Sequence, residues 1–424
     1  MSLSTRDEKS IWHPFTQHHT SAPPLPIARA EGAYLYTQSG ERLLDCISSW
    51  WTCLHGHCHP DIVAAIAQQA ATLDHVLFAG HTHTPAVELA EGLLSAAPGF
   101  GKVFYSDNGS TAVEVALKIA LHYWQNIGQP QRTRLAALEH GYHGDTFGAM
   151  AAGRGSGFFY SYSAVLPRVD ILSPETPAIE AYFQEHGADV AGFLLEPLVQ
   201  GAGGMRMYAP SIVDAWCAAA RKAGALVLMD EVMTGFGRTG TLFAHQQLSH
   251  TPDVLCLSKG ITGGMLPLSV TMTTEAVFQA FLGESFSRAL AHGHSYTANP
   301  IACAAALASL RLFESGAPQR GMATIAATHT RCLPLLCAAV PGLTNPRQTG
   351  TIAAVDLPGD AVYGGAQSQA VRLACYKAGL LLRPMGKVLY FMPPYCVTSA
   401  ELEQAYTTLA EILPAALTGG TDGR

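Results

Sequence analysis

Two titratable residues, Lys259 and Asp230, each come directly after a short apolar run of the kind that forms a buried strand. Lys259 lies in a Ser-Lys-Gly turn after residues 254–257, and Asp230 ends the run that begins at residue 225. A lysine amine forms an imine with a carbonyl compound, and a carboxylate can keep a heteroaromatic ring nitrogen protonated. Taken singly, each residue is explained more simply as a turn residue, so the hypothesis depends on what accompanies the pair.

A third element, residues 106–111, has the composition of a helix start. Apolar side chains follow it with helical spacing, and Glu114 and Lys118 lie four residues apart on the expected outer face. A helix start presents backbone N–H groups and the positive end of the helix dipole, so Gly109, Ser110 and Thr111 could bind a phosphate group. Asp, Asn and Ser are also ordinary capping residues, and a capped helix is the simpler explanation of this stretch alone.

Two glycine-rich turns follow other predicted strands. Tyr142 and His143 lie between glycines, where either ring could stack on a flat ligand, although a plain turn would explain them as well. Residues 196–204 indicate a flexible polar loop. An anion site, an aromatic platform, an acid and a lysine at successive strand ends together match the needs of pyridoxal phosphate: an anchored phosphate, a fixed ring plane, a paired ring nitrogen and an imine-forming amine.

Short apolar runs alternate with helical patterns through the middle of the chain, which predicts an α/β fold with a mostly parallel sheet flanked by helices. The predicted strands are 102–105, 135–138, 190–195, 225–229 and 254–257. Ligands of such sheets bind beyond the carboxyl ends of the strands, so these junctions should converge. We expect residues 46–305 to form a large cofactor-binding domain. Residues 1–45, with a hairpin around Ser39 and Gly40, should join residues 306–424 in a smaller α+β domain.

The composition excludes several classes of protein. Only 13% of the 424 residues are charged, the net charge is −7, and no basic block attracts a nucleic-acid backbone or a membrane surface. The amino-terminal segment lacks the apolar stretch of a secretory signal, and no apolar run is long enough to span a bilayer, so we expect a cytoplasmic protein. The ten cysteines show no Cys-x-x-Cys pair, which favours buried reduced thiols.

A histidine-rich segment, residues 55–59, raises a metalloprotein as an alternative of a different class. His55, His57 and His59 alternate along the segment, and His81 and His83 follow. An alternating pattern of this kind can chelate a metal ion, but no carboxylate or further ligand lies at a recognisable spacing. We therefore predict packing and loop roles for these histidines, and no metal.

Four segments resemble the class III aminotransferases of fold type I. They are residues 107–116 (DNGSTAVEVA), 141–150 (GYHGDTFGAM), 196–208 (EPLVQGAGGMRMY) and 230–240 (DEVMTGFGRTG). Within that class, the paired tryptophans 50 and 51 and the segment 383–395 resemble the biotin-pathway subfamily, which moves an amino group from S-adenosylmethionine to 8-amino-7-oxononanoate. The resemblance covers residues 11–395 and implies a pyridoxal phosphate enzyme that acts as a homodimer with shared active sites.

The resemblance also implies a role for each matching residue. Lys259 would hold the cofactor, Asp230 would pair with its ring nitrogen, and Tyr142 would line the ring or the substrate. Gly109 and Ser110 would hold the phosphate group, joined by His294 and Ser295 of the second subunit. Arg383 would bind the substrate carboxylate through a two-pronged contact, with Trp50, Gly293 and Tyr390 shaping the channel.

Two positions depart from the subfamily pattern. Phe15 stands where the pattern has a tyrosine whose hydroxyl lies near the substrate, and His294 stands where a proline is common. Both departures concern the substrate and the amino donor more than the class of reaction. Another class III enzyme acting on an ω-amino acid or a diamine would share every cofactor residue, and lysine could replace S-adenosylmethionine as the donor.

Overall fold

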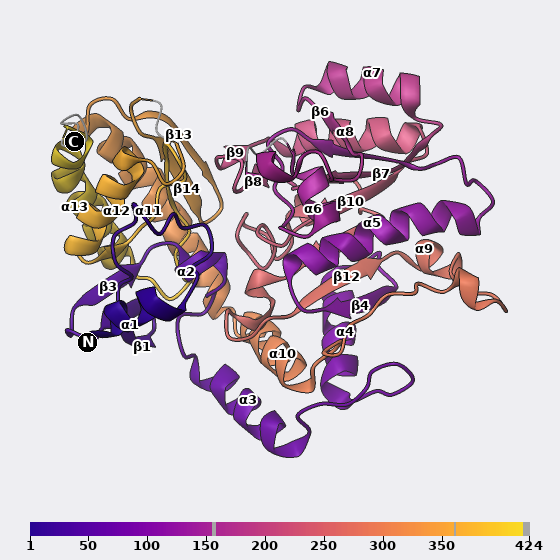
Figure 1. Cartoon of the computed structure of the whole chain (residues 1–424), viewed down its shortest axis with the longest axis horizontal. Coiled ribbons are helices and arrows are strands. Elements are labelled where there is room, and N and C mark those ends of the chain that lie inside the picture. The colour runs from indigo at the N-terminus through magenta and orange to yellow at the C-terminus, as the bar shows by residue number, and fades with distance from the viewer. Residues whose placement is uncertain (155–157, 360–361, 419–424) are drawn as a thin grey trace. The chain divides into compact units, whose positions relative to one another are not determined.

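The computed structural model describes residues 1–154, 158–359 and 362–418, and the chain divides into two compact units. Unit 2 is continuous and runs from Pro60 to Gln319, whereas unit 1 combines Met1–His59 with Arg320–Arg424. Figure 1 shows the sheet of unit 2 with its helices and, separately, the helices and strands of unit 1. Both ends of the chain therefore contribute to one unit, and the middle forms the other.

The boundaries of the units differ from the predicted 45/46 and 305/306. Residues 46–59 belong to unit 1 because backbone hydrogen bonds tie them to its carboxy-terminal part: Cys46 N donates to Leu381 O, and Met392 N donates to Cys46 O. Helix α10 (Pro300–Glu314) belongs to unit 2, where it packs against α3 (Pro60–Thr72) and α4 (Thr84–Ala96). Neither tie has a local signature in the sequence.

Unit 2 is built on a seven-stranded sheet in the order β4-β12-β11-β10-β7-β5-β6. Strand β12 runs antiparallel to both of its neighbours, and β11, β10, β7, β5 and β6 are mutually parallel. The mostly parallel α/β sheet predicted from the sequence is confirmed. The strands are β4 (Lys102–Ser106), β5 (Arg134–Leu138), β6 (Asp170–Leu172), β7 (Val190–Leu195), β10 (Leu226–Asp230), β11 (Val254–Leu257) and β12 (Ser269–Thr273).

Helices cover both faces of this sheet. Figure 1 shows α5 (Gly109–Asn126) against one face and α7 (Thr176–His186) and α8 (Pro210–Lys222) against the other. Two strands escaped the sequence prediction: β6 has only three residues, and the alternating polar side chains of β12 lack the apolar run that marked the others. The core under α5 is apolar, with Val113, Ala116 and Ala120 fully buried.

Unit 1 has two small sheets. The predicted hairpin is present as β2 (Tyr34–Thr37) and β3 (Arg42–Asp45), and it extends into a sheet of order β1-β2-β3-β15. The second sheet has the order β13-β14-β16. The remaining elements are β1 (Ile27–Glu31), β13 (Thr344–Thr349), β14 (Ile352–Asp356), β15 (Leu380–Leu381), β16 (Val388–Phe391), α1 (Leu3–Ser10), α2 (Ser48–Trp51), α11 (Ala317–Ala339), α12 (Ala366–Lys377) and α13 (Ser399–Thr418). Because β15 pairs with β3, this α+β unit requires both ends of the chain.

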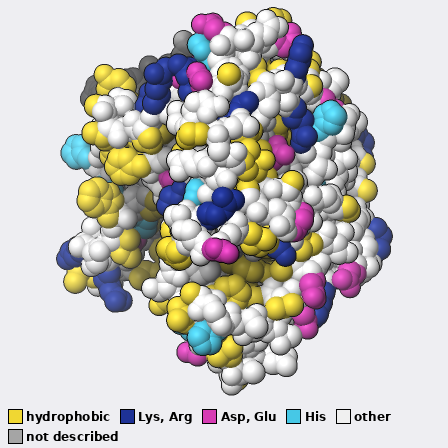
Figure 2. Space-filling model, turned by 90° about the vertical axis from the view of Figure 1, so that its right-hand side faces the viewer, with side chains coloured by type: hydrophobic (Ala, Val, Ile, Leu, Met, Phe, Trp, Pro, Cys, Tyr) yellow, Lys and Arg dark blue, Asp and Glu magenta, His cyan; other side chains and the backbone are white. Residues whose placement is uncertain are grey.

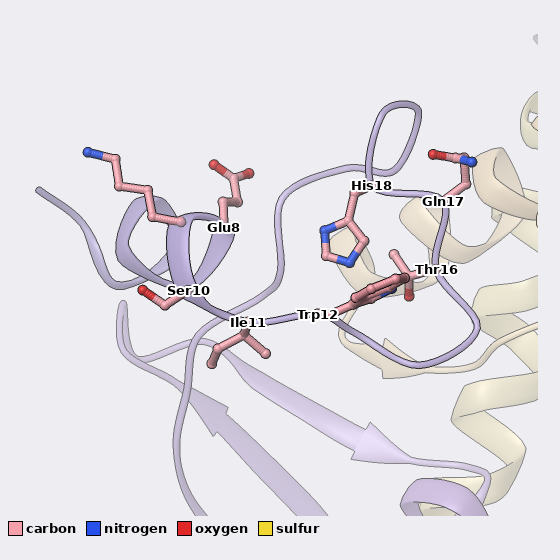
Figure 3. A pocket seen from close by; sticks show the side chains of 8 residues that line it. Glu8, Ser10, Ile11, Trp12, Thr16, Gln17 and His18 are labelled. Carbon is pink, nitrogen blue, oxygen red and sulfur yellow. The ribbon is translucent and has the colours of Figure 1, made fainter.

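The amino-terminal segment of unit 1 turns back on itself and forms an open pocket. Figure 3 shows Trp12 and His18 on this segment, and Trp12 is 91% exposed. The backbone N–H of His13 donates to His18 Nε2 at 3.0 Å, which closes the turn. The pocket is lined by Glu8, Lys9, Ser10, Ile11, Trp12, Thr16, Gln17 and His18, none of which was predicted as a site residue.

The face of the molecule in Figure 2 shows no large patch of like-charged side chains. Lysine, arginine, aspartate and glutamate side chains are scattered there among polar and apolar ones. In the three described stretches of the chain, every helix is too short or too polar to cross a bilayer.

Candidate active site

Lys259 follows β11 and opens the single 3-10 turn η4 (Lys259–Thr262) with a left-handed backbone, φ 41°. This conformation is unfavourable for a residue with a Cβ atom, and such strain clusters at functional sites. The side chain keeps some surface exposure, but burial of its amine lowers the pKa below its ordinary value, an effect opposed by the carboxylates of Asp230, Glu196 and Asp145. A lowered pKa favours the neutral amine, the form that attacks a carbonyl carbon.

Asp230 ends the strand next to β11, because β10 and β11 pair in parallel with Asp230 opposite Cys256. Its Oδ2 lies 2.7 Å from Nδ1 of His143, and its Oδ1 accepts a hydrogen bond of 3.0 Å from the backbone N–H of Val232. The side chains of His143 and Asp230 are 1% and 4% exposed, so the pair is enclosed in protein. A buried carboxylate needs such partners, and here they fix its orientation. His143 is therefore a partner of Asp230, whereas the sequence offered it as a stacking platform.

Tyr142 lies on the same turn and is held at both ends. Its hydroxyl donates to Asp145 Oδ1 at 2.9 Å, and its backbone N–H donates to Glu196 Oε1 at 3.0 Å. The ring stacks on Phe159, with ring centroids 5.9 Å apart. The loop that carries Tyr142 is thus tied to the end of β7, close to Asp230.

Glu196 is buried directly after β7. Besides the Tyr142 amide, it accepts a hydrogen bond of 2.9 Å from the backbone N–H of Gly201. Burial raises the pKa of Glu196 to about 7, an effect that His143 opposes and Asp230 increases. The following segment is not the flexible loop predicted from the sequence, because β8 (Val199–Gln200) and β9 (Arg206–Met207) form a short hairpin and Gln200 is fully buried.

The start of α5 lies against the chain that follows Asp230. Asn108 caps the helix by accepting the backbone N–H of Thr111 at 3.1 Å, and the Thr111 hydroxyl donates to Asp107 Oδ1 at 2.9 Å. Thr111, predicted as a phosphate contact, therefore takes part in the helix cap. Gly109 and Ser110 are the first two residues of the helix. A Cβ atom on Gly109 would lie 2.6 Å from Cγ1 of Val232, so only glycine permits this close approach.

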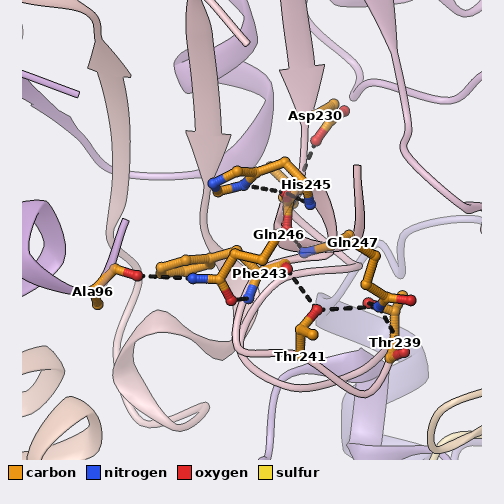
Figure 4. A network of polar contacts seen from close by, with 11 residues as sticks. Ala96, Asp230, Thr239, Thr241, Phe243, His245, Gln246 and Gln247 are labelled. Carbon is orange, nitrogen blue, oxygen red and sulfur yellow. Dashed lines mark hydrogen bonds and ion pairs between the residues drawn. The ribbon is translucent and has the colours of Figure 1, made fainter. Parts of the chain in front are cut away.

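Glu231 fixes the loop that returns from Asp230. Its carboxylate is fully buried and accepts the backbone N–H groups of residue 244, at 2.5 Å, and of His245, at 2.7 Å. The imidazole Nδ1 of His245 lies 2.8 Å from the same carboxylate. Figure 4 shows this network continuing through Gln246, whose side chain donates to Ala96 O at 2.8 Å. The two neighbouring acids thus have separate roles, and Glu231 is structural.

Unit 1 brings together Phe15, Trp50 and Arg383, three of the residues predicted to bind the substrate. The guanidinium carbon of Arg383 lies 5.3 Å from the ring centroid of Trp50, and the ring of Phe15 meets Trp50 edge to face at 5.9 Å. Tyr363 completes the cluster: Arg383 lies 5.3 Å from its ring centroid and donates a hydrogen bond to its hydroxyl. Tyr363 was not predicted as a site residue, because it lies twenty residues before Arg383 without a recognisable motif.

Tyr390 occupies a different position from the one predicted. Its side chain is 4% exposed, and its hydroxyl accepts the indole N–H of Trp51 at 3.0 Å. It supports the paired tryptophans from inside unit 1, whereas Trp50 is 44% exposed.

Gly293, His294 and Ser295 lie on a segment of unit 2 before α10. Gly293 and Ser295 are exposed, and the neighbouring His292 lies with its Nδ1 3.0 Å from Nζ of Lys118, further along α5 than Gly109. His294 accepts the backbone N–H of Tyr296 through Nδ1 at 3.2 Å.

The histidines of the alternative metal hypothesis have local partners. His57 Nε2 lies 2.9 Å from Asp45 Oδ2, and the rings of His55 and His59 meet edge to face. His83 caps α4 and bonds to Ala298 O at 2.7 Å. Within residues 1–154, 158–359 and 362–418, no group of three or more histidine, cysteine or acidic side chains is arranged to hold a metal ion.

Comparisons with known proteins agree with this geometry. The family model for class-III aminotransferases matches residues 15–413. An adenosylmethionine-8-amino-7-oxononanoate aminotransferase from Synechococcus elongatus is 49% identical over 420 residues, which cover 95% of this chain and 98% of the relative. A relative of the same name from Geobacter sulfurreducens is 38% identical and covers 95% of each chain.

Solved structures show the same likeness. The crystal structure of the adenosylmethionine-8-amino-7-oxononanoate aminotransferase from Methanocaldococcus jannaschii has a TM-score of 0.93 at 33% identity, covering 97% of this chain and 98% of the other. An amine transaminase from an uncultivated Pseudomonas species, solved with pyridoxal phosphate bound, has a TM-score of 0.87 at 31% identity, with 97% and 98% covered. This chain therefore belongs to the class-III aminotransferase family and is a transaminase.

Proposed function

We propose that this chain transfers an amino group from S-adenosylmethionine to 8-amino-7-oxononanoate and so makes 7,8-diaminononanoate for biotin biosynthesis. One observation carries the proposal: Lys259 and buried Asp230 lie at the ends of two adjacent parallel strands, and burial lowers the pKa of Lys259. The substrates are those in the name of the Synechococcus elongatus relative, which matches this chain over nearly its whole length.

The chain depends on pyridoxal phosphate, and the residues of unit 2 fit this cofactor. Gly109 and Ser110, at the start of α5, would hold its phosphate group, because N–H groups in the first turn of a helix have no partner inside the helix. Tyr142 would line its ring, Asp230 would pair with its ring nitrogen, and Lys259 would bind it covalently. When bound, the cofactor supplies an electron sink for the substrate carbon that loses a proton.

Lys259 would move that proton. Its Nζ accepts a proton from the donor carbon that carries the amino group, which requires the neutral amine that burial favours. Asp230 would face the ring nitrogen, because its contacts with His143 and with the Val232 amide orient its carboxylate.

Arg383 would select the keto acid. A guanidinium binds a carboxylate through two parallel N–H donors, and this guanidinium lies over the rings of Trp50 and Tyr363. Trp50, Phe15 and Gly293 would shape the channel for the aliphatic chain, with Tyr390 supporting it through Trp51.

We further propose a cytoplasmic homodimer whose partners are small-molecule substrates alone. His294 and Ser295 of the second copy would complete each phosphate site, and their exposed segment before α10 supports this assignment.

A second candidate is a class III enzyme that acts on an ω-amino acid or a diamine. The ω-transaminase from Pseudomonas jessenii, with a TM-score of 0.89 at 27% identity, favours this alternative. Lysine is the alternative amino donor.

Incubation of the purified protein with 8-amino-7-oxononanoate and either S-adenosylmethionine or lysine, followed by mass spectrometry of the diamine, tests the proposal. A parallel panel of ω-amino acids and simple ketones tests the alternative. We expect the diamine with S-adenosylmethionine. Its absence with both donors, together with turnover in the panel, would reject the biotin-pathway function and leave the transaminase.

A further inference from the structure

Glu114 does not lie where its spacing from Lys118 predicted. The expected outer pair is absent, because Lys118 Nζ lies 3.0 Å from His292 and Glu114 turns towards the loop that carries Tyr142. Its Oε1 accepts three hydrogen bonds: from the Thr146 hydroxyl at 2.6 Å and from the backbone N–H groups of residues 148 and 149 at 2.6 and 3.1 Å. A Cβ atom on Gly148 would lie 2.5 Å from Oε2, so any larger residue there would displace the Glu114 carboxylate from this position.

These contacts determine the direction of a short hydroxyl chain. A carboxylate accepts hydrogen bonds and donates none, so the Thr146 hydroxyl proton points at Glu114. The oxygen of Thr146 can then only accept from Ser110, whose Oγ lies 2.7 Å away, and the backbone N–H of Thr146 donates in return to Ser110 Oγ at 2.9 Å. Ser110, Thr146 and Glu114 thus form a chain in which each donor has one acceptor.

The chain joins two parts of the cofactor site. Ser110 lies in the first turn of α5, and Thr146 follows Tyr142 and Asp145 on the loop after β5. The loop also lies close to the helix at Gly144, where a Cβ atom would come within 2.4 Å of the Ser110 side chain. The distance between the start of α5 and the Tyr142 loop is therefore set by these contacts.

We propose that Glu114 and Thr146 are positioning residues that set the spacing between the phosphate-binding and ring-binding parts of the site. The proposal rests on the proposed function, in which Ser110 holds the phosphate group and Tyr142 lines the ring. A ligand that spans both parts must match their spacing, whereas a ligand that occupies one part need not. Affinity for pyridoxal phosphate should therefore depend on the chain far more than affinity for pyridoxal.

The test compares Thr146→Val, which removes the hydroxyl at nearly constant volume, with Thr146→Ser, which keeps it. Each full-length variant is freed of cofactor and titrated separately with pyridoxal phosphate and with pyridoxal, followed by absorbance. We expect Thr146→Val to raise the Kd for pyridoxal phosphate about tenfold, as for loss of a hydrogen bond to a charged group, and to change the Kd for pyridoxal less than about twofold. Thr146→Ser should stay within about twofold of the wild type for both ligands.

One further variant serves as a control and another as an independent test. Thr72→Val removes an exposed hydroxyl from α3 and should leave both affinities unchanged. Glu114→Gln should raise the Kd for pyridoxal phosphate, and thermal unfolding of the cofactor-free proteins reports any loss of fold.

Each outcome has a definite meaning. Unchanged binding of pyridoxal phosphate by Thr146→Val would overturn the inference, and so would an equal loss of affinity for both ligands, which indicates a general structural defect. Failure of the wild-type protein to bind pyridoxal phosphate would instead overturn the proposed function.

Discussion

The residues around Lys259 and the residues around Arg383 are held by different kinds of interaction. Around Lys259, carboxylates are buried and accept hydrogen bonds from nearby backbone N–H groups, as Asp230 does from Val232 and Glu196 does from Tyr142 and Gly201. Around Arg383, the contacts are mainly ring faces and edges, with one hydrogen bond from Arg383 to the Tyr363 hydroxyl, and Trp50 and Phe15 are 44% and 38% exposed. Directional hydrogen bonds predominate in the first group, whereas cation–π and edge-to-face ring contacts predominate in the second.

This difference suits a division of labour. Hydrogen bonds to buried charges tolerate little displacement, so a site built from them keeps one geometry for a constant cofactor. Aromatic stacking and cation–π contacts tolerate sliding and rotation, so a site built from them can accept substrates of different shape. Substitutions near Lys259 should therefore lower kcat, and substitutions near Arg383 should mainly change KM.

Lys259→Ala is the largest test of the first half of this comparison. We expect a loss of turnover on the order of 10⁴-fold or more, with loss of the absorbance of the covalently bound cofactor, because no other group takes over both tasks of the amine. Lys222→Ala, at the exposed end of α8, is the matched control and should behave as the wild type. Persistent absorbance and turnover in Lys259→Ala would end the assignment.

Asp230→Asn tests whether charge or shape matters at the neighbouring strand end. The amide keeps the size of the side chain but loses its charge opposite the ring nitrogen, so kcat should fall on the order of 10² to 10³-fold. The measurement is kcat in saturating substrate. A fall in kcat below about threefold would show that the carboxylate is only structural.

Arg383→Ala addresses the aromatic cluster. We expect the KM for the keto acid to rise about 10- to 100-fold with little change in kcat, since a two-pronged bond to a carboxylate is lost. Arg383→Lys should recover only part of the affinity, because an ammonium group cannot make the paired contact. An unchanged KM would remove Arg383 from the substrate site.

Low pH should destabilise unit 1, because His329 is buried in its neutral form. Burial lowers the pKa of His329 to about 4, and its neutral ring bonds to Tyr406 and Thr351. As pH falls below 6.5, the unfolded chain takes up a proton before the folded chain does, so the free energy of unfolding should drop by roughly 2 kcal/mol between pH 7 and pH 5. Denaturant titrations at several pH values measure this slope. His329→Gln should flatten it, exposed His19→Gln should not, and equal slopes in both variants would refute the assignment.

Phe15→Tyr should have the smallest effect. The new hydroxyl joins a half-exposed cluster that already contains the Tyr363 hydroxyl, so we expect KM values for donor and acceptor to change less than about threefold. Steady-state kinetics with both substrates measures it. A change in KM above tenfold would show that the residues around Arg383 tolerate as little alteration as those around Lys259.

Elements with a local signal in the sequence could be predicted. Each predicted strand was followed within a few residues by its polar junction, and all five strands are present. Contacts between distant segments could not be predicted. Glu114 was expected to face outward because of its spacing from Lys118, but its partners lie more than thirty residues away, at Thr146 and beyond. The boundary of unit 1 at residue 59 depends on the same kind of contact, since residues 46–59 are fixed by pairing with residues 381–395. Periodicity along the chain carries no information about such pairings.

The pairing of β3 with β15, in which Leu44 lies opposite Leu380, also constrains the order in which the protein folds during its synthesis. A ribosome makes the whole of unit 2 before the last hundred or so residues of the chain, which take roughly 5 to 20 s to add. During that interval the amino-terminal residues have emerged but lack the strand that completes their sheet. Nascent chains stalled before residue 380 should therefore expose Trp51, which is buried in the folded protein, to chaperones, and the completed chain should not.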